Sequence, residues 1–251
     1  MLMRILISRL PARVKLPLRR MRDFIRALRY FGNERYCPVC EKSSSRFRPY
    51  GRTPRKDAQC IHCGALERHR FLWLFLRKKS DLFDGKRKRM LHVAPEACFK
   101  TRFEKWLKGD YITADLSDPR AMVKMDICDI QYPDESFDVI YCSHVLEHVE
   151  DDKKAMREFF RVLANGGWAI LLVPIYGDKT FEDPSIKNPA ERLKVFGQED
   201  HVRRYGPDYA DRLREAGFIV EITKVGDLFN RLEAERMGLA ASGEIFYCTK
   251  A

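Results

Sequence analysis

From residue 90 onward, short apolar runs alternate with stretches of helical periodicity, and this pattern constrains the fold more than any other feature. The predicted strands lie at 90–93, 111–114, 122–125, 137–142, 167–174, 218–223 and 244–249, with helices near 98–107 and over 151–163. Strands that alternate with helices indicate a parallel arrangement, because parallel neighbours need a crossover connection that a helix supplies. We therefore expect an α/β fold built on a seven-stranded, mostly parallel sheet.

The charge of the chain is unevenly distributed. The 251 residues carry a formal net charge of +11, but residues 1–31 hold +8, residues 32–89 hold +10, and residues 90–251 hold −7. With 45% hydrophobic and 33% charged residues the composition is that of a globular protein, and no apolar run is long enough for a membrane-spanning helix. The basic total therefore says nothing about the acidic part in which the sheet is expected.

Residues 1–31 form the first of three expected parts, a basic amphipathic segment. Apolar residues recur at helical spacing from Leu18 to Phe31 with arginines between them. Such a helix can lie on an anionic membrane or a partner protein, or it can pack on the body of the chain itself. Arg4 and Arg9 interrupt the apolar stretch that a secretory signal needs, so export is not expected.

Two Cys-x-x-Cys pairs mark the second part, residues 32–80. This spacing is typical of a zinc site, and four thiolates leave no open position, so the zinc would be structural. Free cysteines or a redox pair are the alternative. The remaining cysteines are scattered singly, which fits buried thiols in a reducing cytoplasm. The four predicted ligands are Cys37, Cys40, Cys60 and Cys63.

Acidic residues follow the second and third predicted strands of the last part, residues 81–251. In a parallel sheet, ligands bind beyond the carboxyl ends of the strands. Asp115, after the second strand, is placed to accept hydrogen bonds from the two hydroxyls of a ribose, and Asp126, after the third, to receive an adenine amino group. Each acid alone is a weak signal, but their spacing one strand apart indicates a nucleotide site.

The stretch DICDIQYPDESFDVIYCSHVLEHVEDDKKAMREFFRVLANGGWAILLVP resembles the central signature of class I S-adenosylmethionine-dependent methyltransferases of the type 11 kind. The resemblance is close over residues 88–175 and implies a Rossmann-like sheet with helices on both faces. It also implies that the ribose and the adenine lie at the two acids above, and that the methionine side of the cofactor lies at Ser143 and His144. Leu116 and Ile127, which follow the two acids, complete this implied site.

The loop after the first strand departs from the family pattern. The family has a glycine-rich turn there, whereas this chain has HVAPEACF, with Ala94 and Glu96 in the cofactor-contacting stretch. An alanine resists the positive φ that glycine adopts easily. Either the loop follows a different path, with Glu96 meeting the ammonium group of the cofactor, or cofactor binding is weakened or lost.

A long insertion, residues 175–215, separates the fifth and sixth predicted strands. Long loops in compact domains commonly form lids or binding sites. His201 within it is one predicted general base for a hydroxyl acceptor, and His148, after the fourth strand, is the other. Arg203, Arg204 and Tyr205 are predicted to bind the substrate; the alternative is that this stretch only leads into a capped helix at Asp208.

Three functions remain open on the sequence. The first is methylation of a small molecule or a glycan at a hydroxyl. This hypothesis is favoured because the motifs C-P-x-C, E-R-H-R and S-H-V-L-E-H together resemble bacterial proteins of surface-polysaccharide synthesis. The second is RNA methylation with the basic cysteine module gripping phosphates, which the acidic body disfavours. The third is a non-catalytic scaffold with a degenerate cofactor site. A cytoplasmic location, with membrane attachment through residues 1–31, is the corresponding expectation.

Overall fold

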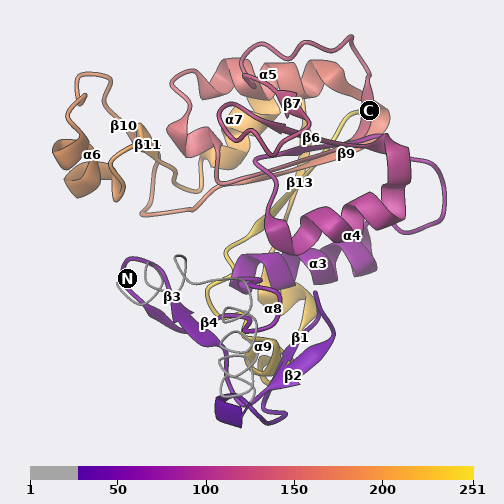
Figure 1. Ribbon diagram of the computed structural model, residues 1–251. Helices are drawn as coiled ribbons and strands as arrows, with labels where there is room; N and C mark the ends of the chain where they lie inside the picture. The colour runs from indigo at the N-terminus through magenta and orange to yellow at the C-terminus, as the bar shows by residue number, and fades with distance from the viewer. Residues whose placement is uncertain (1–27) are drawn as a thin grey trace, which may run out of the picture.

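The computed structural model describes residues 28–251, and four short strands lead the chain into its sheet (Figure 1). These strands form two antiparallel hairpins that carry the cysteines: β1 (Arg35–Cys37) with β2 (Lys42–Ser44), and β3 (Arg48–Tyr50) with β4 (Arg55–Gln59). The helix α3 (Glu67–Lys79) follows directly. The basic segment expected over 1–31 lies almost entirely outside the described residues.

A seven-stranded sheet forms the centre of the molecule, as the sequence predicted. Its strands, in spatial order, are β12 (Ile219–Thr223), β13 (Ile245–Thr249), β9 (Leu163–Leu172), β8 (Phe137–Ser143), β5 (Met90–Val93), β6 (Tyr111–Asp115) and β7 (Val123–Lys124). Every neighbouring pair is parallel except those that involve β13. The sheet is therefore parallel apart from one strand, and it reverses its strand order between β5 and β8.

The predicted strand ends agree with the structure within one residue for most strands, and β9 differs most. This strand begins at Leu163 rather than Gly167, because Leu163 already pairs with Phe137 before a register shift in β8. Gly166 interrupts the pairing with a φ of 72°. The strand therefore begins immediately after helix α5 (Asp152–Val162).

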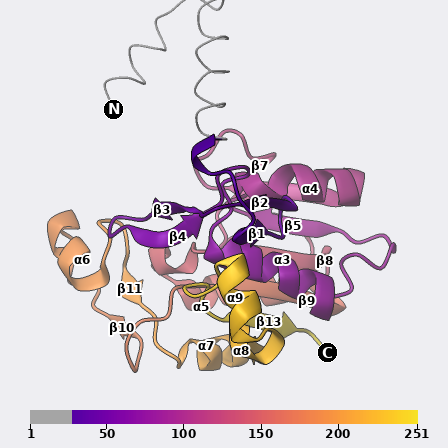
Figure 2. The ribbon, with the colours of Figure 1, turned by 90° about the horizontal axis from the view of Figure 1, so that it is seen from below.

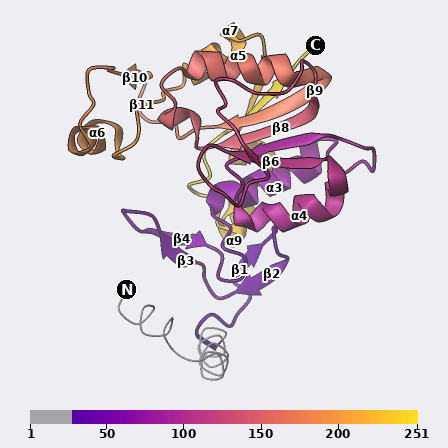
Figure 3. The ribbon, with the colours of Figure 1, turned by 45° about the horizontal axis from the view of Figure 1, so that its top comes forward.

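Helices cover both faces of the sheet (Figure 3). The side chains of β8 alternate between the cores on the two faces. Ile140 and Cys142 belong to the core beneath α5 and α7 (Tyr209–Glu215). Val139 and Tyr141 belong to the core beneath α3 and α4 (Ala97–Leu107). A strand buried on both faces reads as a continuous apolar run, and this is why the pattern of β8 was clear in the sequence.

The cysteine module shares its core with the sheet. Phe47 and Phe71 lie in the same buried cluster as Tyr141 and Trp168 of the sheet. Between β12 and β13, two short helices, α8 (Val225–Leu228) and α9 (Arg231–Met237), return to the module (Figure 2). The parts expected over 32–80 and 81–251 therefore pack as one body.

Buried Arg70 fastens this junction. Its guanidinium donates to the carbonyls of Ala58 and Ala65 in the module and to those of Met237 and Gly238 at the end of α9. Hydrogen bonds from a charged group to carbonyls are stronger than neutral ones. Segments that are distant in sequence are thus joined through one side chain.

The insertion extends beyond the sheet at the left of Figure 1. It contains β10 (Phe181–Glu182), which pairs with β11 (Arg203–Arg204), and between them α6 (Pro189–Phe196). The sequence of α6 sets its ends: Asn188 caps the first turn, and Gly197 takes the left-handed conformation that terminates the helix. Within residues 28–251, none of the helices is long and apolar enough to cross a membrane.

Candidate functional site

The carboxyl ends of β5 and β8 lie side by side where the strand order reverses. The chain goes from β5 to β6 and β7 on one side, and then continues with β8 on the other. Ligands of open parallel sheets bind in the crevice at such a switch point. The predicted cofactor residues stand at this edge: Ala94 and Glu96 after β5, Asp115 and Leu116 at β6, Asp126 and Ile127 after β7, and Ser143 and His144 at β8.

Two loops at the switch point take backbone conformations that are unusual for their residues. Ala94 has a φ of 48° and His144 a φ of 56°. Non-glycine residues with positive φ are uncommon, and such strain gathers at functional sites. Ala94 therefore adopts the conformation that glycine would favour, held by a hydrogen bond from its N–H to the carbonyl of Ala114. The missing glycines do not prevent a left-handed turn here.

The two acids shape their own loops. Oδ1 of Asp115 accepts hydrogen bonds from the backbone N–H groups of Ser117 and Asp118, which leaves Oδ2 for a ligand. Exposed Asp126 accepts from the N–H of Cys128. The two neighbouring residues differ: the side chain of Leu116 is 60% exposed, whereas Ile127 is buried in the core. Ser143 is buried, and its Oγ has no hydrogen-bond partner among the described residues.

Glu96 is fixed by the protein rather than left open. Nε2 of His92 donates to Oε2 over 2.8 Å, and the hydroxyl of Tyr141 donates to Oε1 over 2.9 Å. Nε2 of His69, from α3, lies 3.5 Å from Oε1. Burial opposes the charge, but the hydrogen bonds from His69 and His92 prevail and lower the pKa of Glu96. Through these contacts Glu96 stabilises the loop after β5. A contact between Glu96 and the ammonium group of the cofactor stays a prediction.

The two predicted bases lie together. The rings of His148 and His201 pack edge to face, with centroids 4.6 Å apart. His148 lies in the short helix η2 (Leu146–His148) that follows β8, and His201 comes from the insertion. The N–H of Val202 donates to the carbonyl of Glu147, so the insertion is bonded to η2 at this point. Burial lowers the pKa of His201, which keeps its imidazole neutral near neutral pH.

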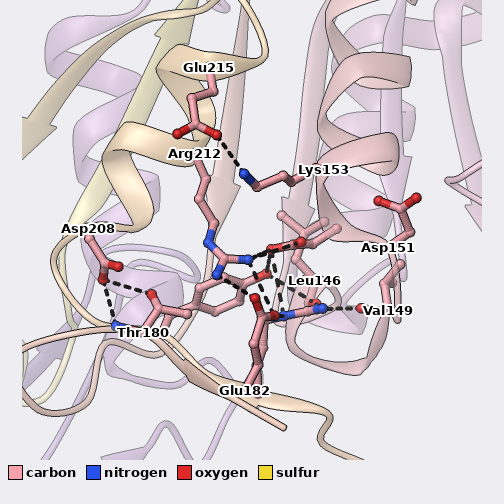
Figure 4. Close-up of polar contacts among 12 residues, drawn as sticks. Leu146, Val149, Asp151, Lys153, Thr180, Glu182, Asp208, Arg212 and Glu215 are labelled. Carbon is pink, nitrogen blue, oxygen red and sulfur yellow. Dashed lines mark hydrogen bonds and ion pairs between the residues drawn. The ribbon is translucent and has the colours of Figure 1, made fainter. Parts of the chain in front are cut away.

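Arg203 connects the insertion to η2 and the residues that follow it. This buried side chain donates to the carbonyls of Leu146, Val149 and Glu150 and to the carboxylate of Glu182. Figure 4 shows Arg212 of α7 reaching the same carboxylate. The guanidinium is therefore occupied by the protein, and these contacts give it a structural part; its predicted substrate role stays a prediction.

The other two predicted substrate residues differ in exposure. Tyr205 is fully buried, and its hydroxyl donates to Asp152 over 2.6 Å. Arg204 is exposed and lies over the ring of Tyr176. Only the exposed arginine could meet an acceptor without rearrangement. A cleft of about 420 Å³ lies beside Arg203, and it is lined both by carboxylates such as that of Glu150 and by basic side chains such as that of Lys187.

The four predicted metal ligands are brought together as the spacing predicted. Their Sγ atoms lie within 4.8 Å of one another, and Cys37–Cys63 and Cys40–Cys60 are each 3.7 Å apart. A disulfide would need about 2.05 Å, whereas four sulfurs at about 2.3 Å from a tetrahedral zinc are about 3.8 Å from one another. Each pair turns sharply after its second cysteine, where Glu41 and Gly64 have positive φ.

Several residues at the site were not predicted from the sequence. Glu147 and Asp200 stand beside the two histidines, and His69 reaches Glu96 from the cysteine module. The spacing His144, Glu147, His148, which places three such side chains around one helical turn, was the available signal for Glu147. No local signal existed for His69, because its partner lies in another segment.

The chain matches known methyltransferases over its middle part. Residues 95–171 match the family model described as a methyltransferase domain. Ajmaline N-methyltransferase of Rauvolfia serpentina is 37% identical over 68 residues, which are 27% of this chain and 23% of that enzyme. An uncharacterized methyltransferase of Bacillus subtilis is 38% identical over 74 residues, 30% of this chain and 28% of that protein.

Among solved structures, a similar one is the S-adenosylmethionine-dependent methyltransferase of Mesorhizobium loti, with 17% identity and a TM-score of 0.44 over 70% of this chain and 96% of that one. The chain spans only about a quarter of the length of the two sequence relatives above. The matched residues run from the loop after β5 into β9, so they include the carboxyl end of β8 but not β5 itself. Residues 95–171 of this chain are therefore similar to part of a methyltransferase domain.

Proposed function

We propose that the protein transfers a methyl group from S-adenosylmethionine to a hydroxyl of a small molecule or a glycan. The observation that carries this proposal is the edge at β5 and β8, where a family-matched segment, two strained loops and two carboxylates converge. Among relatives, ajmaline, phosphoethanolamine and rifamycin methyltransferases are named for small-molecule substrates. The acceptor of this chain is our proposal and does not follow from theirs.

The residues at the edge fit the cofactor in their chemistry. A ribose offers two hydroxyl donors, and Asp115 has Oδ2 available to accept them. An adenine amino group is a donor, and Asp126 is an exposed acceptor one strand further along. Buried Ser143, whose Oγ has no partner among residues 28–251, would complete the methionine side. The donor and acceptor types thus agree with what the cofactor offers.

The bound cofactor supplies a methyl group activated on a cationic sulfur. With it bound, the acceptor oxygen would bond to the methyl carbon in line as the carbon–sulfur bond breaks, S-adenosylhomocysteine would be released, and the hydroxyl proton would pass to a base. Alignment of the two reactants provides much of the acceleration in such displacements. The protein's part is therefore to hold the acceptor at η2, beside His148 and His201, the predicted proton acceptors.

A structural zinc ion at the four cysteines is the second part of the proposal. The 3.7 Å separations of the sulfurs fit the edges of a tetrahedral site, and its four ligands leave no position for substrate. RNA methylation remains the alternative, because residues 32–89 carry +10. The mixed lining of the cleft near the insertion gives no support to a polyanionic acceptor. Docking through residues 1–31 and a cytoplasmic location stay predictions, as does a non-catalytic scaffold.

Calorimetric titration with S-adenosylmethionine and S-adenosylhomocysteine tests the proposal without knowledge of the acceptor. We expect both to bind the full chain, and we expect Asp115→Asn to weaken binding about 10-fold or more, the loss of one charge-assisted hydrogen bond. Asp178→Asn, at an exposed position of the insertion, is the matched control. If the folded chain released or absorbed no heat of binding with either ligand, only the hypothesis of a non-catalytic scaffold would remain. Salt-sensitive RNA binding that depends on the cysteines would favour RNA methylation.

A further inference from the structure

A second cluster of metal-ligating side chains lies at η2, apart from the four cysteines. Glu147, His148 and His201 each offer one ligand atom, and these atoms lie within 4.8 Å of one another. Glu147 is 1% exposed and His201 is 3% exposed, so the protein has removed both from water. Burying such groups is costly unless they find partners.

The acceptors near Nδ1 of the two histidines orient them as metal ligands. Nδ1 of His148 lies 3.1 Å from Oδ2 of Asp200, and Nδ1 of His201 lies 3.3 Å from the carbonyl of Phe196. Both partners are acceptors, so each Nδ1 carries the proton and each Nε2 keeps a lone pair. Histidines that bind metals commonly donate their other N–H to a carboxylate or a carbonyl in this way.

Two polar atoms of the cluster are buried and lack partners among the described residues. Oε1 of Glu147 lies 3.1 Å from Nδ1 of His144, but its Oε2 has no hydrogen-bond partner. Nε2 of His201 has none either. Buried polar atoms in native proteins nearly always have a partner, and a bound ion is one explanation when the protein supplies none. One cation between these atoms would satisfy both.

We propose that Glu147, His148 and His201 bind one divalent transition-metal ion. Two imidazoles and one carboxylate form a set that suits such ions and leaves coordination positions open. The cluster follows the carboxyl end of β8, where the acceptor is expected. In the open positions, one or two oxygens of the acceptor would bind, and the cation would lower the pKa of a bound hydroxyl. Asp200 would act as a positioning residue for His148.

The part of this inference that concerns the acceptor rests on the proposed function, whereas metal binding does not. The cation would stabilise the oxygen anion of the acceptor, so its proton could pass to water, and His148 and His201, with their Nε2 lone pairs on the ion, would be ligands rather than bases. A cation also favours acceptors with adjacent oxygens, such as the vicinal hydroxyls of a sugar or a catechol, because two oxygens can bind the same ion.

Titration of the untagged, zinc-loaded full chain with Co²⁺ tests the site directly, without cofactor or acceptor. Cobalt bound by nitrogen and oxygen lacks the intense thiolate charge-transfer absorption of a four-cysteine site, so the spectrum distinguishes the two. We expect one Co²⁺ per chain with weak visible bands, while the zinc content stays at one per chain. No second ion, or cobalt with thiolate absorption only, would overturn the proposal.

Three near-isosteric variants locate the ligands. His201→Asn and His148→Asn keep a donor at the Nδ1 position and remove Nε2, and Glu147→Gln keeps an oxygen for His144 and removes the charge. We expect each to abolish the cobalt bands, and Asp200→Asn to weaken binding about 10- to 100-fold. His62→Asn, at an exposed histidine outside the cluster, is the control. Unchanged cobalt binding in the three folded variants would contradict the assignment, whether or not S-adenosylmethionine binds.

Discussion

Nε2 of His69, in the helix that leaves the cysteine module, lies 3.5 Å from Oε1 of Glu96, in the loop that follows the first strand of the sheet. Nδ1 of His69 is within hydrogen-bond distance of the N–H of Leu66, at the start of the same helix. The module thus contacts the loop at the predicted cofactor edge through one histidine. A change in the module can therefore alter the shape of that loop.

The burial of His69 predicts a stability that falls as the solution becomes acidic. Burial lowers the pKa of His69 below its ordinary value of 6.5, although Glu96 opposes the shift. The unfolded chain therefore takes up a proton at this residue before the folded chain does, and stability present above about pH 6.5 declines below it. Protonation of Glu96, whose folded pKa is also lowered, adds to the loss at lower pH.

Urea unfolding between pH 7.5 and pH 5.5 measures this effect. We expect the His69→Gln variant to be less stable at pH 7.5 but to lose less stability on acidification than the parent chain. His62→Gln, at an exposed histidine, should leave the slope unchanged. An equal slope in the parent and in His69→Gln would show that His69 does not titrate differently in the two states.

Loss of the proposed zinc ion from the four cysteines should destabilise the sheet as well as the module. Phe47 and Phe71 share one core with Tyr141 and Trp168, so unfolding of the module exposes a face of the sheet. We expect Cys60→Ser to lose one zinc per chain and to lower the melting temperature of the whole chain in a single transition. Cys128→Ser, at a half-buried thiol outside the site, should retain zinc. Two separate transitions would contradict a shared core.

Arg70→Met should cost about 3 kcal/mol or more of unfolding free energy, because buried carbonyls lose a charged donor. Four carbonyls depend on this guanidinium, two in the module and two at α9. Denaturant unfolding measures the loss, and Arg77→Met, at an exposed arginine of the same helix, is the control. A loss no larger than in the control would mean that other contacts hold α9 against the module.

Local patterns were enough to predict most of the sheet and its edge, but not the contacts between distant segments. The apolar runs of β5, β6 and β8 are buried, Asp115 ends β6, and Asp126 follows β7 by two residues, so both features are visible in the sequence. β13 runs antiparallel to both of its neighbours, and the helices α8 and α9, which connect it to β12, pack against the core of the module. No periodicity carries that information.

The insertion shows the same limit at the level of side chains. A run of charged and aromatic residues beside His201 predicted a substrate site, yet Arg203 and Tyr205 are buried in contacts with η2 and α5. Exposure depends on what the segment packs against, which the run itself does not specify. The proximity of His148 and His201 likewise depends on that packing.

Ala94 should tolerate glycine and reject a branched side chain. A φ of 48° strains an alanine by about 1 kcal/mol. Glycine avoids this strain, but it gives the unfolded chain more conformational entropy, which offsets the gain by a similar amount. We expect Ala94→Gly to bind S-adenosylmethionine as the parent does. Valine, with its branched Cβ, fits this conformation poorly, so Ala94→Val should weaken calorimetric binding while the far-ultraviolet spectrum stays native. Equal binding by both variants would mean that the cofactor does not contact this loop.

Gly206 should be irreplaceable in the insertion for a steric reason. A Cβ at this residue would lie 2.3 Å from the carbonyl carbon and 2.5 Å from the Cα of Lys179, both of them backbone atoms that cannot rotate away. Gly206 also donates its N–H to the hydroxyl of Thr180, and Figure 4 shows Thr180 bonded in turn to Asp208. Gly206→Ala must therefore separate the two segments, at a cost of about 2–3 kcal/mol.

Separation at Gly206 would displace the part of the insertion that carries His201 to η2, because the N–H of Tyr176 bonds the carbonyl of Tyr205 just beside it. We expect Gly206→Ala to make the insertion sensitive to limited proteolysis and to weaken cobalt binding at Glu147, His148 and His201. Gly226→Ala is the matched control, since nothing lies within 4 Å of a Cβ placed there. If Gly206→Ala were cleaved at the same rate as the parent chain, the backbone at Lys179 would be able to move aside while the two segments stay packed together.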